Sequence, residues 1–147
     1  MNRNNILYLV IGALVVAVAV LGYQVYEAKK EPSGVQINLG EVAHQIQIGR
    51  LLVMHAAWKL DQGDHARKEV SMAKVHVADT LHRAADVAIQ LNGARGYSKD
   101  TILEWIYRYA RQARLVDGAS EVHNMVLARF MREEGRDFWR WSAGNRV

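Results

Sequence analysis

The sequence of 147 residues contains no cysteine and a single proline, Pro32. The lack of cysteine excludes disulfide bonds and thiolate chemistry, and it fits a reducing compartment. Blocks of like charge are also missing, because the formal net charge of +4 is spread over segments that carry acids as well as bases. A nucleic-acid interface normally gathers basic residues on one face, so we expect no nucleic-acid partner.

Charge is absent from residues 6–26, in which Gln24 is the only amide. A run of roughly 20 apolar residues is long enough to cross the hydrocarbon core of a bilayer. The run also exceeds the usual apolar region of a cleaved signal peptide, roughly 7–15 residues. We therefore predict an uncleaved membrane anchor over residues 1–28. More basic residues follow the run than precede it, which predicts a single-pass membrane protein with a cytoplasmic C-terminal part.

Residues 29–40 contain Pro32 and two glycines and show no helical period, so they are predicted to form a linker with a short extended piece at residues 35–39. Apolar residues then recur with helical spacing, which predicts an antiparallel all-α bundle over residues 41–135. Residues 136–147 are predicted to be an irregular tail. The expected helices lie at about 42–62, 65–91 and 100–114, and from residue 120 onwards.

Several local signals mark the ends of these helices. Asp64 is predicted to be an N-cap, and Gly93 is placed to end a helix in a left-handed conformation. Thr101 and Glu104 have the spacing of a capping box ahead of the third helix.

One ordered set of residues resembles the C-terminal helical domain of the acyl-CoA dehydrogenases. It consists of Gln90-Leu91-Asn92-Gly93-Ala94-Arg95-Gly96-Tyr97, Tyr107-Arg108, Asp117-Gly118, Glu121-Val122-His123 and Ala128-Arg129. The interval of 27 residues between Gln90 and Asp117 (117 − 90) is similar to the family spacing.

The resemblance implies a flavoprotein oxidoreductase of fatty acid metabolism that desaturates an acyl-CoA thioester between its α- and β-carbons. By resemblance, Asp117 would be the base that removes the α-proton while FAD accepts a hydride, and Gly118 would let the thioester approach the backbone closely. The residues carried over as FAD contacts are Gln90, Leu91, Asn92, Gly93, Ala94, Ala119, Ser120 and Glu121. In family assemblies, part of this contact reaches the flavin of a neighbouring subunit.

The sequence departs from the family pattern at four points. The N-terminal helical domain and the middle β-domain have no counterpart, so the domain is expected to be incomplete alone. The glycine-rich turn reads Gly-Ala-Arg-Gly, the base is Asp rather than the commoner Glu, and Ala119 replaces a common Thr. The chain is thus expected to be a fusion, a truncated gene product or an artificial join behind a membrane anchor.

Two other functions stay open. The first is a non-catalytic, membrane-tethered assembly module that forms a homo-oligomer or binds a full-length dehydrogenase. The second is a metal-binding bundle, because Glu41 with His44 and Asp79 with His82 place a carboxylate and an imidazole at i, i+3. A di-iron site needs further carboxylates, and Asp86 is the only one near, so no metal ligand is assigned.

Overall fold

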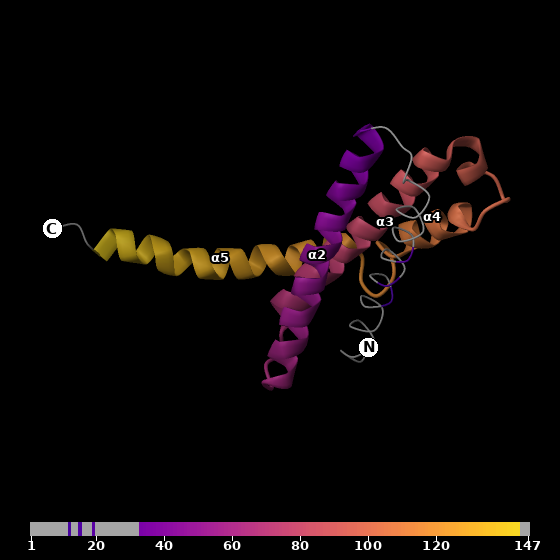
Figure 1. Ribbon diagram of the computed structural model, residues 1–147. Coiled ribbons are helices and arrows are strands. Elements are labelled where there is room, and N and C mark those ends of the chain that lie inside the picture. The colour runs from indigo at the N-terminus through magenta and orange to yellow at the C-terminus, as the bar shows by residue number, and fades with distance from the viewer. Residues whose placement is uncertain (1–11, 13–14, 16–18, 20–32, 145–147) are drawn as a thin grey trace.

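The computed structural model describes residues 33–144 and the isolated positions 12, 15 and 19 (Figure 1). This part of the chain contains four long helices and no strand, which confirms the all-α prediction. The helices are α2 (Ser33–Asp61), α3 (Arg67–Tyr97), α4 (Leu103–Gln112) and α5 (Ser120–Gly144).

Helix α3 is the centre of the fold and contacts α2, α4 and α5. Helix α2 runs antiparallel to α3 and α4 folds back along it, whereas the C-terminal half of α5 extends away from the other helices (Figure 1). The predicted antiparallel arrangement therefore holds for α2, α3 and α4. The tail predicted for residues 136–147 is helical as far as Gly144, because α5 continues without a break.

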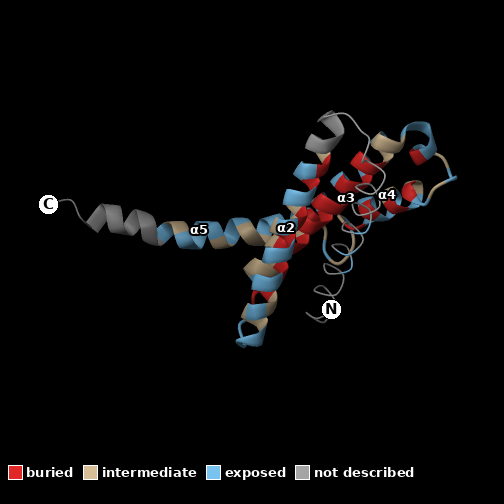
Figure 2. Ribbon diagram, viewed as in Figure 1, coloured by how far each residue is buried: buried red, intermediate tan, exposed pale blue. Residues whose placement is uncertain are grey.

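The buried residues gather along α3 and on the sides of α2 and α4 that face it (Figure 2). On α3 they cover more than one side of the helix, which fits its contacts with α2, α4 and α5. The buried residues of α3 that form the core are Ala73, Val77, Ala78, Leu81, Ala84, Ala85, Val87 and Ala88. Most of them are small, so the neighbouring helices can approach α3 closely.

The predicted linker and its extended piece are wrong from residue 33 onwards, where α2 begins directly after the proline. Leu39, Val42 and Ile46 are all buried, at 8%, 1% and 6% exposure, and their spacing is that of one helix face. Their burial in the shared core outweighs the cost of the two glycines in this segment. The alternation of polar and apolar residues was therefore misleading as a sign of extended structure.

Gly93 has a positive φ of 54°, as predicted, but α3 bends there and continues to Tyr97. Its ψ of −139° differs from that of a left-handed cap, so the predicted capping motif does not form. The extra turn packs tightly, because a Cβ on Gly96 would lie 2.8 Å from the carbonyl oxygen of Ile89.

The other two capping predictions hold only in part. Asp64 accepts a hydrogen bond from the main-chain N–H of Ala66 (3.2 Å). The N-cap itself is Ala66, because α3 begins at Arg67. Thr101 accepts a hydrogen bond from the main-chain N–H of Leu103 (3.3 Å). Glu104 pairs with Arg108 on the next turn (3.1 Å), so the reciprocal bond of a capping box is not formed.

The predicted membrane anchor at residues 6–26 lies, apart from three isolated positions, outside the described residues. Among the helices of the described part, none combines the length and the apolar character needed to cross a bilayer. On this finding, the predicted localisation as a single-pass membrane protein with a cytoplasmic C-terminal part is wrong.

Candidate functional site

Asp117 lies in the loop of residues 113–119, which joins α4 to α5. The loop is closed by a hydrogen bond from the main-chain N–H of Ser120 to the carbonyl oxygen of Arg114 (3.1 Å). Asp117 and Gly118 both have positive φ, at 56° and 93°. Glycine adopts such a conformation freely, whereas aspartate does so at a cost, so the structure around Asp117 must hold this turn in place.

His123, in the first turn of α5, contacts this loop from outside. Its Nε2 lies 3.4 Å from the carbonyl oxygen of Asp117, and its Nδ1 lies 3.1 Å from Oγ of Ser71 on α3. A carbonyl oxygen can only accept, so Nε2 carries the hydrogen and Nδ1 accepts one from the Ser71 hydroxyl. Burial lowers the pKa of His123, which keeps the ring neutral at pH 7. The main-chain contact with Asp117 opposes this shift, and the nearby Lys74 adds to it.

Lys74 lies beneath the same loop and is only 1% exposed. Its Nζ has no hydrogen-bond partner among the described residues. Burial lowers the pKa of Lys74, and the carboxylates of Asp117, Glu121 and Asp79 partly oppose this effect. The loop therefore lies near a buried amine on which three carboxylates and the guanidinium of Arg114 act in opposite directions.

Sequence reasoning assigned no role to Lys74, Ser71 or His123. A signal for Lys74 was present, because Ser71, Lys74, Ala78 and Leu81 follow the three- and four-residue spacing of one helix face. All four are buried. His123 belongs to the motif that carries the family resemblance, but its contact with Ser71 joins residues that are 52 positions apart.

The first group of predicted flavin contacts lies at the end of α3. Gln90, Gly93 and Ala94 are exposed, and no atom comes within 4 Å of the position that a Cβ on Gly93 would take. Leu91 packs against the core, and the side-chain amide of Asn92 donates to a main-chain carbonyl one turn earlier (2.9 Å). This group therefore offers a ligand the exposed backbone of Gly93 and the exposed side-chain amide of Gln90.

The second group of predicted flavin contacts follows Gly118, which is itself exposed. Ala119 is half-buried and Glu121 is exposed, whereas Ser120 is buried and its Oγ has no partner within the described part of the chain. Ser71, which His123 ties to this loop, lies 19 positions before Gln90 on α3. At 1.5 Å per residue, Ser71 and Gln90 are about 28 Å apart along the helix. The first group therefore lies well away, along α3, from the point at which His123 joins this loop to the helix.

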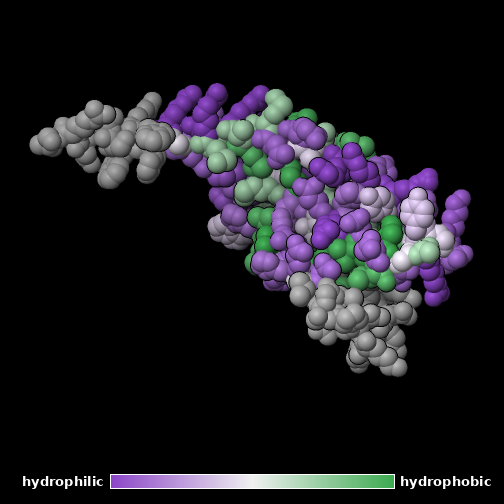
Figure 3. Space-filling model, turned by 90° about the horizontal axis from the view of Figure 1, so that it is seen from above, coloured by the Kyte–Doolittle hydropathy of each residue, from purple (hydrophilic) through white to green (hydrophobic). Residues whose placement is uncertain are grey.

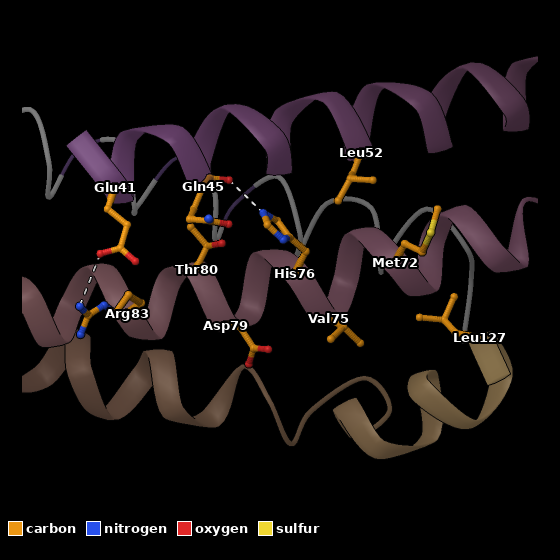
Figure 4. Close-up of a pocket in the computed structure, with 10 residues that line it drawn as sticks. All are labelled: Glu41, Gln45, Leu52, Met72, Val75, His76, Asp79, Thr80, Arg83 and Leu127. Atoms are coloured by element: carbon orange, nitrogen blue, oxygen red, sulfur yellow. Dashed lines mark hydrogen bonds and ion pairs between the residues drawn. The ribbon is translucent and has the colours of Figure 1, made fainter. Parts of the chain in front are cut away.

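The carboxylates of the two predicted metal-binding pairs, Glu41 and Asp79, line a groove along α3 (Figure 4). Glu41 points at Arg83, with 3.7 Å between the charged groups, while Asp79 projects from the opposite side of α3 and pairs with Arg114 at 3.1 Å. The part of the chain that the structure describes contains no group of three or more potential ligands. These acids stabilise helix contacts instead of converging on a metal.

The comparison with protein families identifies the family of the chain. Residues 14–132 match the family model described as the C-terminal domain of acyl-CoA dehydrogenase. The chain belongs to the acyl-CoA dehydrogenase family. This domain begins inside the apolar run of residues 6–26, so the prediction of a separate anchor fused ahead of it has no support.

Known relatives agree with this assignment. The chain is 38% identical over 94 residues to a 3-(aryl)acrylate reductase of Clostridium sporogenes, covering 64% of this chain and 25% of that protein. It is 36% identical over 105 residues to the (R)-benzylsuccinyl-CoA dehydrogenase of Thauera aromatica, covering 71% of this chain and 26% of that protein. The chain thus spans about a quarter of the length of the curated relatives it matches.

Solved structures show the same fold. An acyl-CoA dehydrogenase from Slackia heliotrinireducens superimposes with a TM-score of 0.84 at 27% identity, over 92% of this chain and 38% of that one. A butyryl-CoA dehydrogenase from Megasphaera elsdenii gives a TM-score of 0.81 at 25% identity, over 88% of this chain and 36% of that one.

Proposed function

We propose that the chain acts as the C-terminal domain of a flavin-dependent acyl-CoA dehydrogenase, in which Asp117 is the base for α,β-desaturation of an acyl-CoA thioester. The observation that carries this proposal is the turn at Asp117 and Gly118, where two successive positive φ angles expose the backbone of Gly118 beside a half-buried carboxylate. A thioester can approach such a glycine closely, and the carboxylate then lies within reach of its α-carbon.

The proposed chemistry is a proton abstraction. An oxygen of the Asp117 carboxylate takes the α-proton, the C–H bond breaks, and its electron pair becomes part of the new double bond between the α- and β-carbons. FAD, when bound, supplies the acceptor for the hydride that leaves the β-carbon. Asp117 is one methylene shorter than Glu, so the backbone must bring it closer to the substrate, and its position matters because small misplacements are costly.

The exposed residues fit a flavin better than the buried ones. Gln90 and Glu121 can present polar side chains, and Gly93 can present its open backbone. Leu91 and Ser120 are turned into the fold, so their side chains would not touch a cofactor unless the fold shifts. The separation of about 28 Å along α3 between Gln90 and Ser71, where His123 joins the Asp117 loop to the helix, supports contact with two different flavins in an assembly.

Further parts of the dehydrogenase fold must join this domain, whether on the same polypeptide or on another. Apolar side chains that are exposed in the single chain support such an assembly, and Figure 3 shows apolar surface among polar residues on one face. On α4, Trp105 and Tyr109 are 59% and 42% exposed and stack with 5.4 Å between ring centroids. A homo-oligomer or a complex with a full-length dehydrogenase would cover them, and this assembly role does not need Asp117.

The base assignment can be tested by proton exchange, which does not require the flavin to be reduced. The chain, completed with the N-terminal helical domain and the middle β-domain of a dehydrogenase, is mixed with FAD and an excess of an acyl-CoA deuterated at its α-carbon, and loss of the deuterium is followed by mass spectrometry. We expect faster loss with the wild-type chain than with Asp117→Asn, and Asp61→Asn, an exposed acid at the end of α2, serves as the control. Equal rates for wild type and Asp117→Asn would count against the proposed base.

The flavin contacts are tested separately by equilibrium dialysis against FAD. Gln90→Ala and Glu121→Ala are expected to weaken binding several-fold, whereas Gln112→Ala, an exposed amide in α4, should leave it unchanged. If all three variants bind FAD as the wild type does, the proposed contacts are wrong.

A further inference from the structure

We propose that His123 is a positioning residue for the Asp117 loop: its ring links the Asp117 carbonyl to Ser71 on α3 and so holds the turn that presents the carboxylate. This inference rests on the proposed role of Asp117 as the base. It assigns to His123 a function that acts through the backbone of Asp117 and not by contact with substrate.

The first support is the geometry of the ring. His123 has one ring nitrogen 3.4 Å from the Asp117 carbonyl oxygen and the other 3.1 Å from the Ser71 hydroxyl. A Cβ added to Gly118 would lie 3.0 Å from Nε2 of the same ring. The imidazole therefore contacts two successive residues of the turn and anchors them to a different helix.

The second support is the conformation that needs holding. Asp117 has φ of 56°, a region that residues with a side chain seldom adopt. The hydrogen bond that closes the loop joins Ser120 to Arg114 and leaves the peptide of Asp117 to be fixed by another contact. The Nε2–H of His123 supplies that contact from outside the loop.

The third support is the protonation state. Burial keeps the pKa of His123 below its usual value of 6.5, so near pH 7 one nitrogen donates and the other accepts. The charged group that acts on the ring is Lys74 from α3, which lowers the pKa further, whereas Asp117 acts through its main-chain carbonyl and raises it. A protonated ring would donate from both nitrogens, and the Ser71 hydroxyl would have to rotate to accept.

Nuclear magnetic resonance of the labelled 147-residue chain tests the contact directly. We expect the Asp117 carbonyl and Gly118 amide signals to titrate with the same midpoint as the His123 ring, below pH 6.5. In His123→Phe, both signals should move and lose this titration, whereas His55→Phe, on exposed α2 surface, should change neither. Unchanged signals in His123→Phe would overturn the proposal.

The proton-exchange assay tests the consequence for Asp117. His123→Phe should lower the rate at saturating acyl-CoA by about tenfold or more, with little change in the half-saturating concentration. His123→Gln, whose amide can still donate to a carbonyl, should recover much of the rate. A rate that is the same in wild type and His123→Phe would contradict the positioning role.

Two further results keep the inference separate from the proposed function. If His123→Phe does not fold, Ser71→Ala removes the donor to Nδ1 and should shift the same two signals; signals that stay in place overturn the proposal. If these signals respond but Asp117→Asn exchanges deuterium like the wild type, the base assignment fails while the His123 contact is supported. If the deuterium exchange depends on Asp117 but not on His123, the positioning role is refuted and the base assignment is not.

Discussion

Replacing Lys74 with methionine is expected to stabilise this protein. The side chain is 1% exposed, and its Nζ has no hydrogen-bond partner among the described residues. Burying a polar group without a partner costs about 1–3 kcal/mol. Methionine keeps an unbranched chain of similar length and removes the amine, so Lys74→Met should raise the free energy of unfolding at pH 7 by about 1–3 kcal/mol.

The assay is urea unfolding followed by circular dichroism. A change in the urea midpoint reports a change in stability if the free energy of unfolding has the same slope against urea concentration in wild type and variant. For a protein of this size, each kcal/mol corresponds to a rise of about 2–4 °C in Tm. Lys99→Met is the matched control, since Lys99 is exposed and its replacement should change stability by less than about 0.5 kcal/mol.

The pH dependence gives a second test of the same reasoning. Burial lowers the pKa of Lys74 from 10.5 in the folded chain, so the unfolded chain binds more protons between the two pKa values. Wild-type stability should therefore rise as pH increases through this window, and Lys74→Met should lack that rise. The advantage of the variant should be largest near neutral pH and shrink towards pH 10.5.

One result would refute this reasoning. If Lys74→Met lowers the free energy of unfolding by more than about 1 kcal/mol, the carboxylates of Asp117 and Glu121 offset the burial of the amine, and Lys74 is a net stabilising cation.

Gly118→Ala should lower the free energy of unfolding by about 1–2 kcal/mol, because φ is 93° and the new Cβ would lie 3.0 Å from a histidine ring. Gly40→Ala, in helix α2 with no atom within 4 Å of the new Cβ, should instead raise the free energy of unfolding by about 0.5–1 kcal/mol. If both variants are less stable than the wild type, the positive φ of Gly118 is not what distinguishes the two sites. Burial, helped by the nearby Arg114, lowers the pKa of His82 from 6.5, so stability should fall as pH drops from 6.5 through the folded-state pKa, and His82→Phe should reduce that fall in urea titrations at several pH values. Breaking the half-exposed pair of Arg114 and Asp79 (3.1 Å) with Asp79→Asn should cost less than about 1 kcal/mol, and a larger loss would mean that the pair is less screened than its exposure indicates.

The sequence predicted the helical core well where apolar residues repeat over many turns. The face of α3 that contains Ala73, Val77, Leu81 and Ala88 was identified correctly, because periodic burial is a strong signal over a long helix. The start of α2 was missed, since Leu39 and Val42 reveal their helical spacing only together with Ile46. The glycines and the proline in front of them gave a stronger, misleading local signal.

The candidate site was predicted only in part, for a different reason. Asp117 and Gly118 could be proposed from the sequence because the groups of residues that carry the resemblance keep their order and spacing. Lys74 and Ser71 lie more than 40 positions earlier, and only the packing of α3 against the loop brings them to Asp117. Residues that act through such contacts leave little trace in a local pattern.

The membrane prediction was wrong because hydropathy shows that side chains avoid water and does not show whether lipid or protein covers them. An apolar run without a polar stripe is typical of a helix surrounded by lipid and of one surrounded by protein. The match of the family domain from residue 14 onwards leaves the separate anchor without support.

The most direct test of the account is to compare three chains that differ only at position 117, each completed with the same N-terminal and middle domains of a dehydrogenase, in their rate of α-deuterium loss from an acyl-CoA. The wild type and Asp117→Glu both carry a carboxylate at this position, and Asp117→Asn carries an amide of the same size as the native side chain. We predict that both carboxylate chains promote exchange above the rate in buffer and that Asp117→Asn does not. Exchange by Asp117→Asn at the wild-type rate would show that the base lies elsewhere.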